Sequence, residues 1–194
     1  MLDLVKSIKS KNNTCTDKHT KHSYIQSFYS YMFAALKTKP INLLEIGLCV
    51  GDSTKIWDMY FTHKNTNIFS FDNKEDRYNG ALEQYTYTDR VYLNVLHHKN
   101  LLETKTNNNK LFHETIINTQ YNIIIDDASH NYLDQQISYN FSLTNLKNGG
   151  ILIIEDVRPK NVNKLLALDE RLFVVDLTNQ RKKIRDNILI CMIA

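Results

Sequence analysis

The sequence predicts an α/β protein with a doubly wound sheet of seven strands, mostly parallel with an antiparallel last strand. Short runs rich in Ile, Val, Leu and Phe alternate along the chain with longer stretches of helical pattern. Several of the short runs are apolar throughout, which is typical of parallel strands that are covered on both faces. The chain has 194 residues, 42% of them hydrophobic, so we expect one domain over residues 1–194.

Seven short segments rich in β-branched and aromatic residues are expected to be strands: 41–48, 67–72, 90–96, 121–127, 150–157, 172–177 and 187–194. Four segments between them have helical patterns: 52–61, 74–85, 101–118 and 131–146. The last two strands are separated only by the basic loop "TNQRKKIRD", which is too short for a crossover helix. These two strands should therefore pair antiparallel. The basic residues of the loop (Arg181, Lys182, Lys183 and Arg185) are expected to be solvated, with contact to an acidic acceptor as the alternative.

The composition excludes several classes of function. A formal net charge of +3 is too small to indicate a nucleic-acid or membrane partner. The three cysteines, Cys15, Cys49 and Cys191, are far apart and odd in number, so neither a disulfide framework nor a zinc site is expected. The N-terminus has no apolar signal region, and no stretch reaches the ~18 apolar residues of a transmembrane helix. We expect a cytoplasmic protein.

Acidic residues stand where the predicted strands end. Ligands of doubly wound sheets bind outside the carboxyl ends of the strands, near the point where the strand order reverses. Acids at four separate strand ends therefore indicate a site at this edge of the sheet. These residues are Glu45 in the first strand, Asp72 in the second, Asp126 and Asp127 in the fourth, and Glu155 and Asp156 in the fifth.

The stretch "LLEIGLCVGDS" favours a cofactor site. Gly47 and Gly51 permit a tight turn and close approach of a ligand to the backbone, and the following helix offers free N–H groups. Asp72 ends the second strand about 20 residues further on, where an acid commonly holds ribose hydroxyls. This spacing differs from the dinucleotide fingerprint, so an adenosyl ligand without a pyrophosphate suits it.

The stretch "IIIDDASHNY" places two aspartates and His130 directly after a buried strand. Carboxylates next to an imidazole suit cation binding or proton transfer. A second interpretation stays open, in which Asp127 or Ser129 caps the helix near Asn131 and His130 is a polar residue at its start. In the N-terminal segment, His19 and His22 are expected at the surface, and Tyr24, Phe28, Tyr31 and Phe33 are expected mainly in the core, with Tyr24 also placed to line the cofactor cleft.

The stretches "EIGLCVGDS", "FSFD", "IIIDDASH" and "LKNGGILIIEDV" resemble the class I S-adenosylmethionine-dependent methyltransferases. The resemblance is to the metal-dependent sugar O-methyltransferases of macrolide tailoring, the macrocin and mycinamicin types. "TDKHTKHSY" followed by "FYSYMF" is similar to a segment that precedes the first strand in that group. The resemblance spans about residues 16–157 and implies a Rossmann-like core over 41–194 behind an N-terminal helical or cap segment over 1–40.

The resemblance also implies site residues. Magnesium, or another divalent cation, would be held by Asp127, Glu155 and Asp156, and His130 would act as general base beside Asp127. The acceptor would be a small molecule, a sugar hydroxyl or a glycosylated compound, and a homo-oligomer is compatible with the family. S-adenosylmethionine would be contacted by Glu45, Gly47, Gly51, Ser53, Asp72, Asp126 and Tyr24.

Departures and rival functions are also visible. The family's acidic residue after the third strand is absent, and His97 or His98 stands there instead. A catechol-type O-methyltransferase is the main alternative, but it would normally show Asp-Asn where this chain has "EDV". Amino-methyltransferases would show Pro-Pro-Tyr after the fourth strand, and cap 2′-O-methyltransferases would need lysines around the catalytic acid, whereas no lysine stands at Glu155-Asp156. A non-catalytic S-adenosylmethionine-binding protein would not need the acid–histidine cluster.

Overall fold

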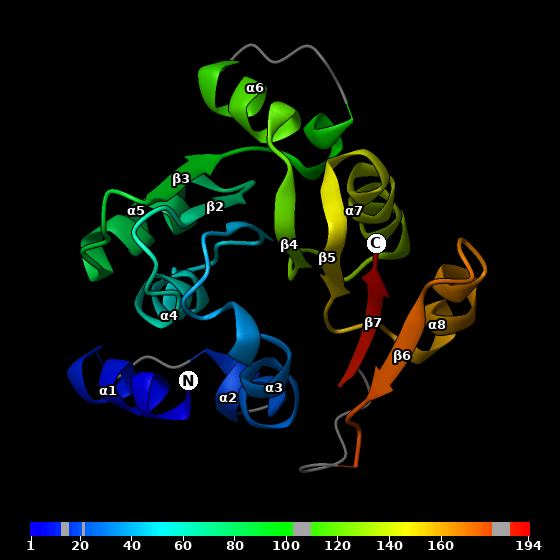
Figure 1. The fold of residues 1–194 in the computed structure, drawn as a ribbon, viewed down its shortest axis with the longest axis horizontal. Coiled ribbons are helices and arrows are strands. Elements are labelled where there is room, and N and C mark those ends of the chain that lie inside the picture. Colours follow the sequence, from blue (N-terminus) through cyan, green and yellow to red (C-terminus); the bar gives the residue numbers. More distant parts are fainter. Residues whose placement is uncertain (13–15, 21, 103–109, 180–186) are drawn as a thin grey trace.

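Seven strands form one sheet in the order β3-β2-β1-β4-β5-β7-β6 (Figure 1). The computed structural model describes residues 1–12, 16–20, 22–102, 110–179 and 187–194. All seven predicted strands are present within about four residues of the expected bounds: β1 Asn42–Ile46, β2 Asn67–Asp72, β3 Val91–Val95, β4 Tyr121–Asp126, β5 Leu146–Ile154, β6 Phe173–Asp176 and β7 Ile188–Ile193. The basic loop residues 181–183 and 185, and Cys15, lie outside the described residues.

The strand pairings confirm the doubly wound topology. β1 pairs parallel with both β2 and β4, and β3 and β5 extend the sheet on either side. β7 pairs antiparallel with β6, as the short last loop predicted, and it also pairs antiparallel with β5. The order reverses between β1 and β4, so the loops after these two strands border the switch point where such sheets bind ligands.

Helices connect the strands and fill the N-terminal segment: α1 Leu2–Asn12, α2 Asp17–Thr20, η1 Ile25–Tyr29, α3 Ser30–Met32, η2 Ala34–Leu36, α4 Asp52–Tyr60, α5 Glu75–Gln84, η3 His98–Leu101, α6 Lys110–Asn118, α7 Tyr132–Asn145 and α8 Pro159–Leu166. The predicted helix over 101–118 is present only as α6 in the part that is described. The helix α8 was not predicted, although Pro159 stands in its first turn, a favoured position for proline. None of the helices in the described ranges is long and apolar enough to cross a membrane.

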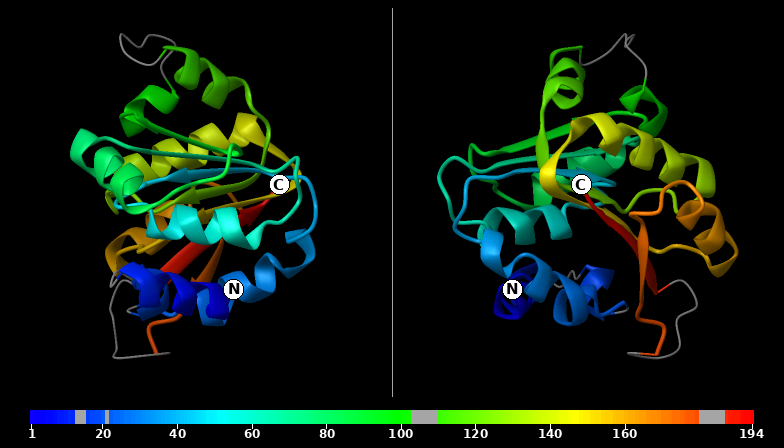
Figure 2. Two further views of the ribbon diagram at one scale, coloured as in Figure 1. Left: turned by 90° about the vertical axis from the view of Figure 1, so that its left-hand side faces the viewer. Right: turned by 45° about the vertical axis from the view of Figure 1, so that its right-hand side comes forward.

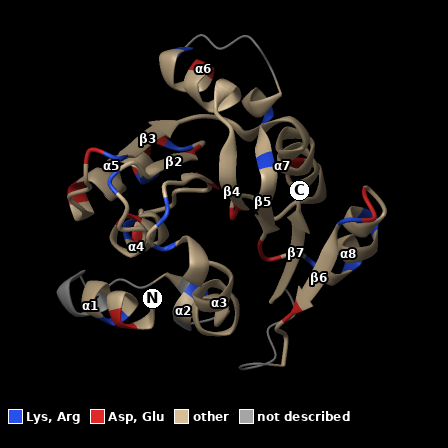
Figure 3. Cartoon of the chain, viewed as in Figure 1, with Lys and Arg blue, Asp and Glu red and all other residues tan. Residues whose placement is uncertain are grey.

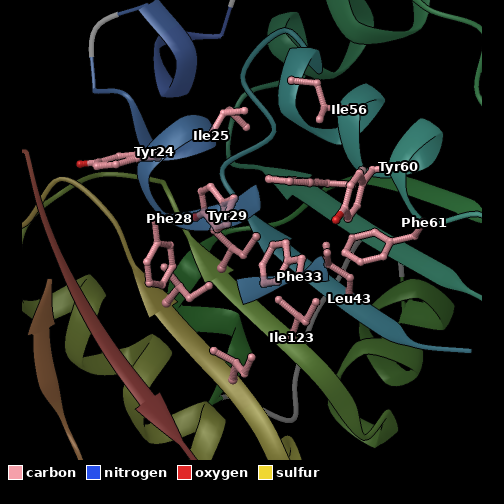
Figure 4. Close-up of a cluster of buried hydrophobic side chains, with 14 of the residues drawn as sticks. Tyr24, Ile25, Phe28, Tyr29, Phe33, Leu43, Ile56, Tyr60, Phe61 and Ile123 are labelled. Atoms are coloured by element: carbon pink, nitrogen blue, oxygen red, sulfur yellow. The ribbon is translucent and has the colours of Figure 1, made fainter. Parts of the chain in front are cut away.

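The sheet is the middle of three layers (Figure 2). Side chains of successive residues point to opposite faces, so Leu43 and Ile123 enter one apolar cluster while Leu44 and Ile124 enter the other. The first cluster is completed by α1, η1 and α4, with many aromatic side chains (Figure 4). The second is completed by α6, α7 and α8. Strands that are covered on both faces explain why the sequence shows unbroken apolar runs.

The two faces give a test of the packing. Leu44→Ala should lower the free energy of unfolding by about 2–5 kcal/mol, because the fully buried Leu44 side chain leaves a cavity between β1 and its helices. Leu133→Ala removes the same atoms from a side chain that is 68% exposed and should change stability by less than about 0.5 kcal/mol. Urea denaturation followed by circular dichroism measures both. Equal effects of the two substitutions would contradict this placement of the core.

Candidate functional site

The loop after β1 makes the tight turn that its glycines predict. Gly47, Cys49 and Gly51 all have positive φ angles. A Cβ atom on Gly47 would lie 2.1 Å from the carbonyl oxygen of Asp127, and one on Gly51 would lie 2.1 Å from the Tyr87 hydroxyl. The glycines therefore let this loop press against the loop after β4 and against Tyr87. Glycine is needed at these two positions because other protein groups come close to the backbone there. The sequence had suggested only the approach of a ligand.

Glu45 is held by protein groups at the end of β1. Its carboxylate is fully buried and accepts hydrogen bonds from Thr54 Oγ1 at 2.5 Å and from Trp57 Nε1 at 3.0 Å. Burial raises the pKa of Glu45, while Lys18 and the Ser53, Thr54 and Trp57 hydrogen bonds lower it. Glu45 thus anchors the start of α4 behind the glycine loop.

Asp72 lies at the wall of a cavity of about 210 Å³. One of its oxygens accepts from the Cys49 backbone N–H at 3.0 Å and lies 3.3 Å from Arg77. Gly47 from the loop after β1 and Leu96 from the end of β3 line the same cavity. The structure therefore brings the acid of β2 and the glycine loop of β1 to one hollow, as the sequence predicted.

His98 is the histidine that faces this cavity. It follows β3, at the position where the resemblance led us to expect an acid, while His97 is exposed. The Nε2 atom of His98 lies 2.6 Å from Ser138 Oγ and 3.7 Å from Asp126 Oδ2. Burial raises the pKa of Asp126, and His98 lowers it. The carboxylate of Asp126 therefore lies next to the His98 ring. Asp126 itself lines neither of the two cavities.

A second cavity of about 390 Å³ adjoins the first. The two share Gly47, Arg77 and Ala128 as lining residues, so they meet at the loops after β1 and β4. Ser53 and Asp127 line the second cavity from opposite sides of the switch point. The lining also includes Thr16 from the N-terminal segment, Cys49 and His130. A ligand that fills both hollows would pass the glycine loop on its way to the acids.

Asp127, His130 and Asp156 form a cluster at this edge of the sheet. Each offers one ligand atom within 4.8 Å of the others, and His130 Nε2 lies 3.8 Å from Asp156 Oδ2. Figure 3 shows acidic residues where β4 and β5 end, on the side that faces α2. The buried Nδ1 atom of His130 makes no hydrogen bond within the described ranges. The helix α7 is capped by Asn131, which accepts from the Asp134 N–H at 3.0 Å, so Asp127 and Ser129 are not its caps.

Four side chains of the N-terminal segment reach the same acids. Lys18 donates to both Asp127 and Glu155, the latter at 2.7 Å, and the Tyr29 hydroxyl also donates to Glu155. The Tyr24 hydroxyl donates to Asp156 at 2.6 Å, and His22 Nδ1 lies 3.3 Å from the same oxygen. The N-terminal segment is therefore half of the site. Figure 4 shows Tyr24 and Tyr29 on this segment, next to the aromatic core.

Some expectations for this segment were wrong. His22 was expected at the surface, but it is fully buried and stacks on Tyr24 with a centroid distance of 5.1 Å. Tyr31 was expected in the core, but it is 76% exposed. Lys18 was not predicted as a site residue, because a lysine in a polar stretch of sequence is ordinarily expected to be exposed to solvent. The only available signal was its place in the "TDKHTKHSY" stretch, which also carries His22 and Tyr24.

Charges in this cluster are unevenly compensated. Burial by itself lowers the pKa of Lys18, but Asp127, Glu155 and Glu45 outweigh burial and raise it, so Lys18 is charged. Burial raises the pKa of Glu155, Lys18 lowers it, and Asp127 and Asp156 raise it further. We assign Glu155 as a carboxylate because the charged Lys18 ammonium lies 2.7 Å from its Oε1 atom. One ammonium faces three carboxylates, which favours binding of a further cation.

Backbone strain gathers at the same place. Four non-glycine residues have positive φ in the described ranges, and each lies in a segment that builds the site. Such conformations cost on the order of 1–3 kcal/mol each and persist where the surroundings enforce them, often at functional sites. They are Ser23 (φ 63°), Cys49 (φ 48°), His130 (φ 54°) and Asp156 (φ 52°).

Comparisons with known proteins agree with this architecture. No family model matches the sequence, and no curated protein matches it. Among solved structures, the MycE methyltransferase of the mycinamycin biosynthetic pathway, solved with Mg and SAH, is similar over 98% of this chain at 16% identity, with a TM-score of 0.67. This chain spans 54% of that MycE chain, and 39% of MycE in a complex that also contains mycinamycin VI.

Two further solved structures are similar along most of their own length. A protein from Klebsiella pneumoniae with the provisional name O-methyltransferase matches 99% of this chain and 89% of its own, at 14% identity and a TM-score of 0.63. One from Clostridium thermocellum with the provisional name rRNA methylase matches 90% and 93%, at 16% identity and a TM-score of 0.62. The chain therefore has the fold of the class I S-adenosylmethionine-dependent methyltransferases and resembles MycE in it.

Proposed function

We propose that the protein is an S-adenosylmethionine-dependent O-methyltransferase that acts on a hydroxyl of a sugar or a glycosylated small molecule. The observation that carries this proposal is the Asp127–His130–Asp156 cluster, in which Asp127 and His130 line the second cavity beside the glycine loop. A site for methyl donation and a group for proton removal then lie next to each other. The similarity to MycE, which was solved with mycinamycin VI, favours a sugar-bearing acceptor.

The two adjoining cavities suit the two ends of the cofactor. In the first, Asp72 would accept hydrogen bonds from the ribose hydroxyls, and His98 would lie near the adenine. The methionine end would follow the loop of Gly47 and Ser53 into the second cavity. This direction brings the methyl group toward Asp127 and His130. Holding donor and acceptor in line can contribute on the order of 7–11 kcal/mol to the lowering of the barrier.

The acids fit a divalent cation. Carboxylate oxygens are the ligands that Mg²⁺ prefers, and Asp127 and Asp156 each place one within 4.8 Å of the other and of His130. Glu155 is the third acid of the expected set, but it stands outside this group, and Lys18 and Tyr29 already donate to its Oε1 atom. When bound, the ion would lower the pKa of the acceptor hydroxyl and fix its direction.

His130 is suited to take the proton of the hydroxyl. Its side chain is 33% exposed, so an acceptor in the second cavity can reach it. Neutral imidazole accepts a proton at ordinary pH, and a neighbouring carboxylate such as Asp156 stabilises the imidazolium that forms. The left-handed backbone at His130 turns the residue at the start of α7 so that it lies over the acids.

The acceptor class can be identified with a panel of substrates. Transfer of radiolabelled methyl from S-adenosylmethionine should occur to a glycosylated macrolide or a free deoxysugar. Transfer to catechol alone would favour the catechol-type alternative, and transfer to ribosomal RNA would favour the activity in the name of the Clostridium protein. Tight cofactor binding without transfer to any class would favour a binding protein.

The first prediction concerns the cofactor. Asp72→Ala should weaken S-adenosylmethionine binding by tenfold or more, because a hydrogen bond to a charged group contributes about 1.5–3 kcal/mol. Asp176→Ala, in an exposed residue of β6, should leave binding unchanged. Isothermal titration calorimetry on both variants measures the difference. Unchanged affinity in Asp72→Ala would show that Asp72 does not hold the ribose.

The second prediction concerns the metal. Protein that has been treated with EDTA and desalted should lose methyl transfer and regain it when Mg²⁺ or Mn²⁺ is added, since the ion would lower the pKa of the acceptor hydroxyl. Cofactor binding measured by calorimetry should persist in the metal-free protein, because Asp72 lies in the other cavity. Full turnover of protein shown to be metal-free would refute the requirement.

The third prediction concerns the base. His130→Ala should lower the single-turnover rate by about 10²–10⁴-fold, the usual contribution of a positioned base. Affinity for S-adenosylmethionine and for Mn²⁺ should stay within a few-fold of the wild-type protein. His63→Ala serves as control, since the His63 side chain lies outside both cavities and its one hydrogen bond within the described residues is accepted by Nδ1 from the Asn65 N–H. A large loss of Mn²⁺ affinity would instead make His130 a metal ligand, and a near-normal rate would remove it from the chemistry.

A further inference from the structure

Lys18 is a buried cation within the acidic cluster. Its side chain is only 1% exposed, and its ammonium donates to Asp127 and, at 2.7 Å, to Glu155. Lysine is almost never fully buried unless it is paired. Its burial therefore requires these two carboxylates, and the carboxylates in turn have one positive charge fixed between them before any ion binds.

The acids are divided between two kinds of partner. Glu155 is fully buried and takes Lys18 and Tyr29 on one oxygen. Asp156 lies with Asp127 and His130 in a second group, and Asp127 and His130 of that group line the second cavity. Asp127 takes part in both arrangements. The cluster thus has a deep side, between Asp127 and Glu155, and a cavity side, between Asp127 and Asp156.

We propose that Lys18 is a positioning residue that fills the deep side of the cluster and confines the divalent ion to the cavity side. This inference rests on the proposed function, since it concerns the metal of that same site. An ion between Asp127 and Glu155 would be buried away from the acceptor and from His130. An ion beside Asp127 and Asp156 would border the cavity in which the acceptor binds.

The physical reason is competition between cations. The ammonium of Lys18 and a divalent ion are attracted by the same carboxylates and repel each other, so the resident charge weakens ion binding overall while it excludes the ion from the deep side. Removing the charge should therefore have opposite effects on affinity and on rate. The ion should bind more tightly, because the cluster is more negative, and should act less well, because it also occupies the wrong position.

The test uses two variants and two measurements. In Lys18→Met, Mn²⁺ affinity from titration by electron paramagnetic resonance should rise at least tenfold, while the single-turnover rate at saturating Mn²⁺ falls at least a hundredfold. Lys18→Met combined with Glu155→Gln removes one positive and one negative charge. In this double variant, Mn²⁺ affinity should return to within threefold of wild type, since the deep side no longer attracts the ion. For the same reason, the single-turnover rate should be at least tenfold higher than that of Lys18→Met.

A matched control separates this effect from the loss of any other lysine–carboxylate pair. Lys55→Met removes the pair of Lys55 with Asp58, 3.1 Å apart and outside both cavities, and should change neither measurement. Affinity for S-adenosylmethionine, within threefold of wild type, shows that each variant is folded. The double variant also covers the case in which Lys18→Met alone does not fold.

The outcomes separate the two proposals. If the wild type binds Mn²⁺ and Lys18→Met binds it equally or more weakly, the role of Lys18 is overturned and the metal site stands. If the double variant loses Mn²⁺ affinity, Glu155 is a metal ligand and the role of Lys18 is overturned. If only Lys18→Met binds Mn²⁺, Lys18 is the resident cation and the metal requirement of the proposed function fails. If neither protein binds Mn²⁺, both proposals fail.

Discussion

The attraction between Lys18 and the carboxylates at the ends of β4 and β5 holds the two halves of the site together. β4 and β5 are parallel neighbours, so Asp127 and Glu155 emerge at the same edge of the sheet. Carboxylates that are brought together in this way repel one another unless a positive charge lies between them. The N-terminal segment supplies that charge through Lys18. The ion pairs with Asp127 and Glu155 therefore hold the segment in place and also offset the repulsion between the two acids.

The remaining features of the site follow from this arrangement. Because Lys18 must reach the strand ends, the segment that carries it passes over the sheet edge and buries Tyr24 and Tyr29 against the aromatic core. The loops that meet it are held in left-handed conformations, including Cys49 and Asp156. The glycine loop completes the wall, because Gly47 leaves room for the backbone of Asp127. Packing, strain and charge therefore support one another at the switch point.

The acidic residues of the site fall into two groups, those that bind other protein groups and those that face the cavity. Glu45 and Glu155 are fully buried and engaged with protein donors, so they act on the framework. Asp127 and His130 border the second cavity, so they face whatever enters it. The proposed methyl transfer would need this distinction, because the cofactor would be held firmly while the acceptor hydroxyl is polarised and deprotonated beside it. MycE has the same fold and was solved with Mg and SAH.

The sequence by itself determined the seven strands, their doubly wound order and the edge at which the acids lie, because apolar periodicity and short loops report directly on local structure and strand direction. It also indicated that Asp127 and His130 belong together, since they are three residues apart. Only the tertiary structure decided which distant groups meet those acids. Lys18 and His22 lie more than a hundred residues away from the acids that they contact, and a polar run carries no periodic signal to show that it will be buried. The burial of a lysine is decided by a partner elsewhere in the chain, which local sequence does not contain.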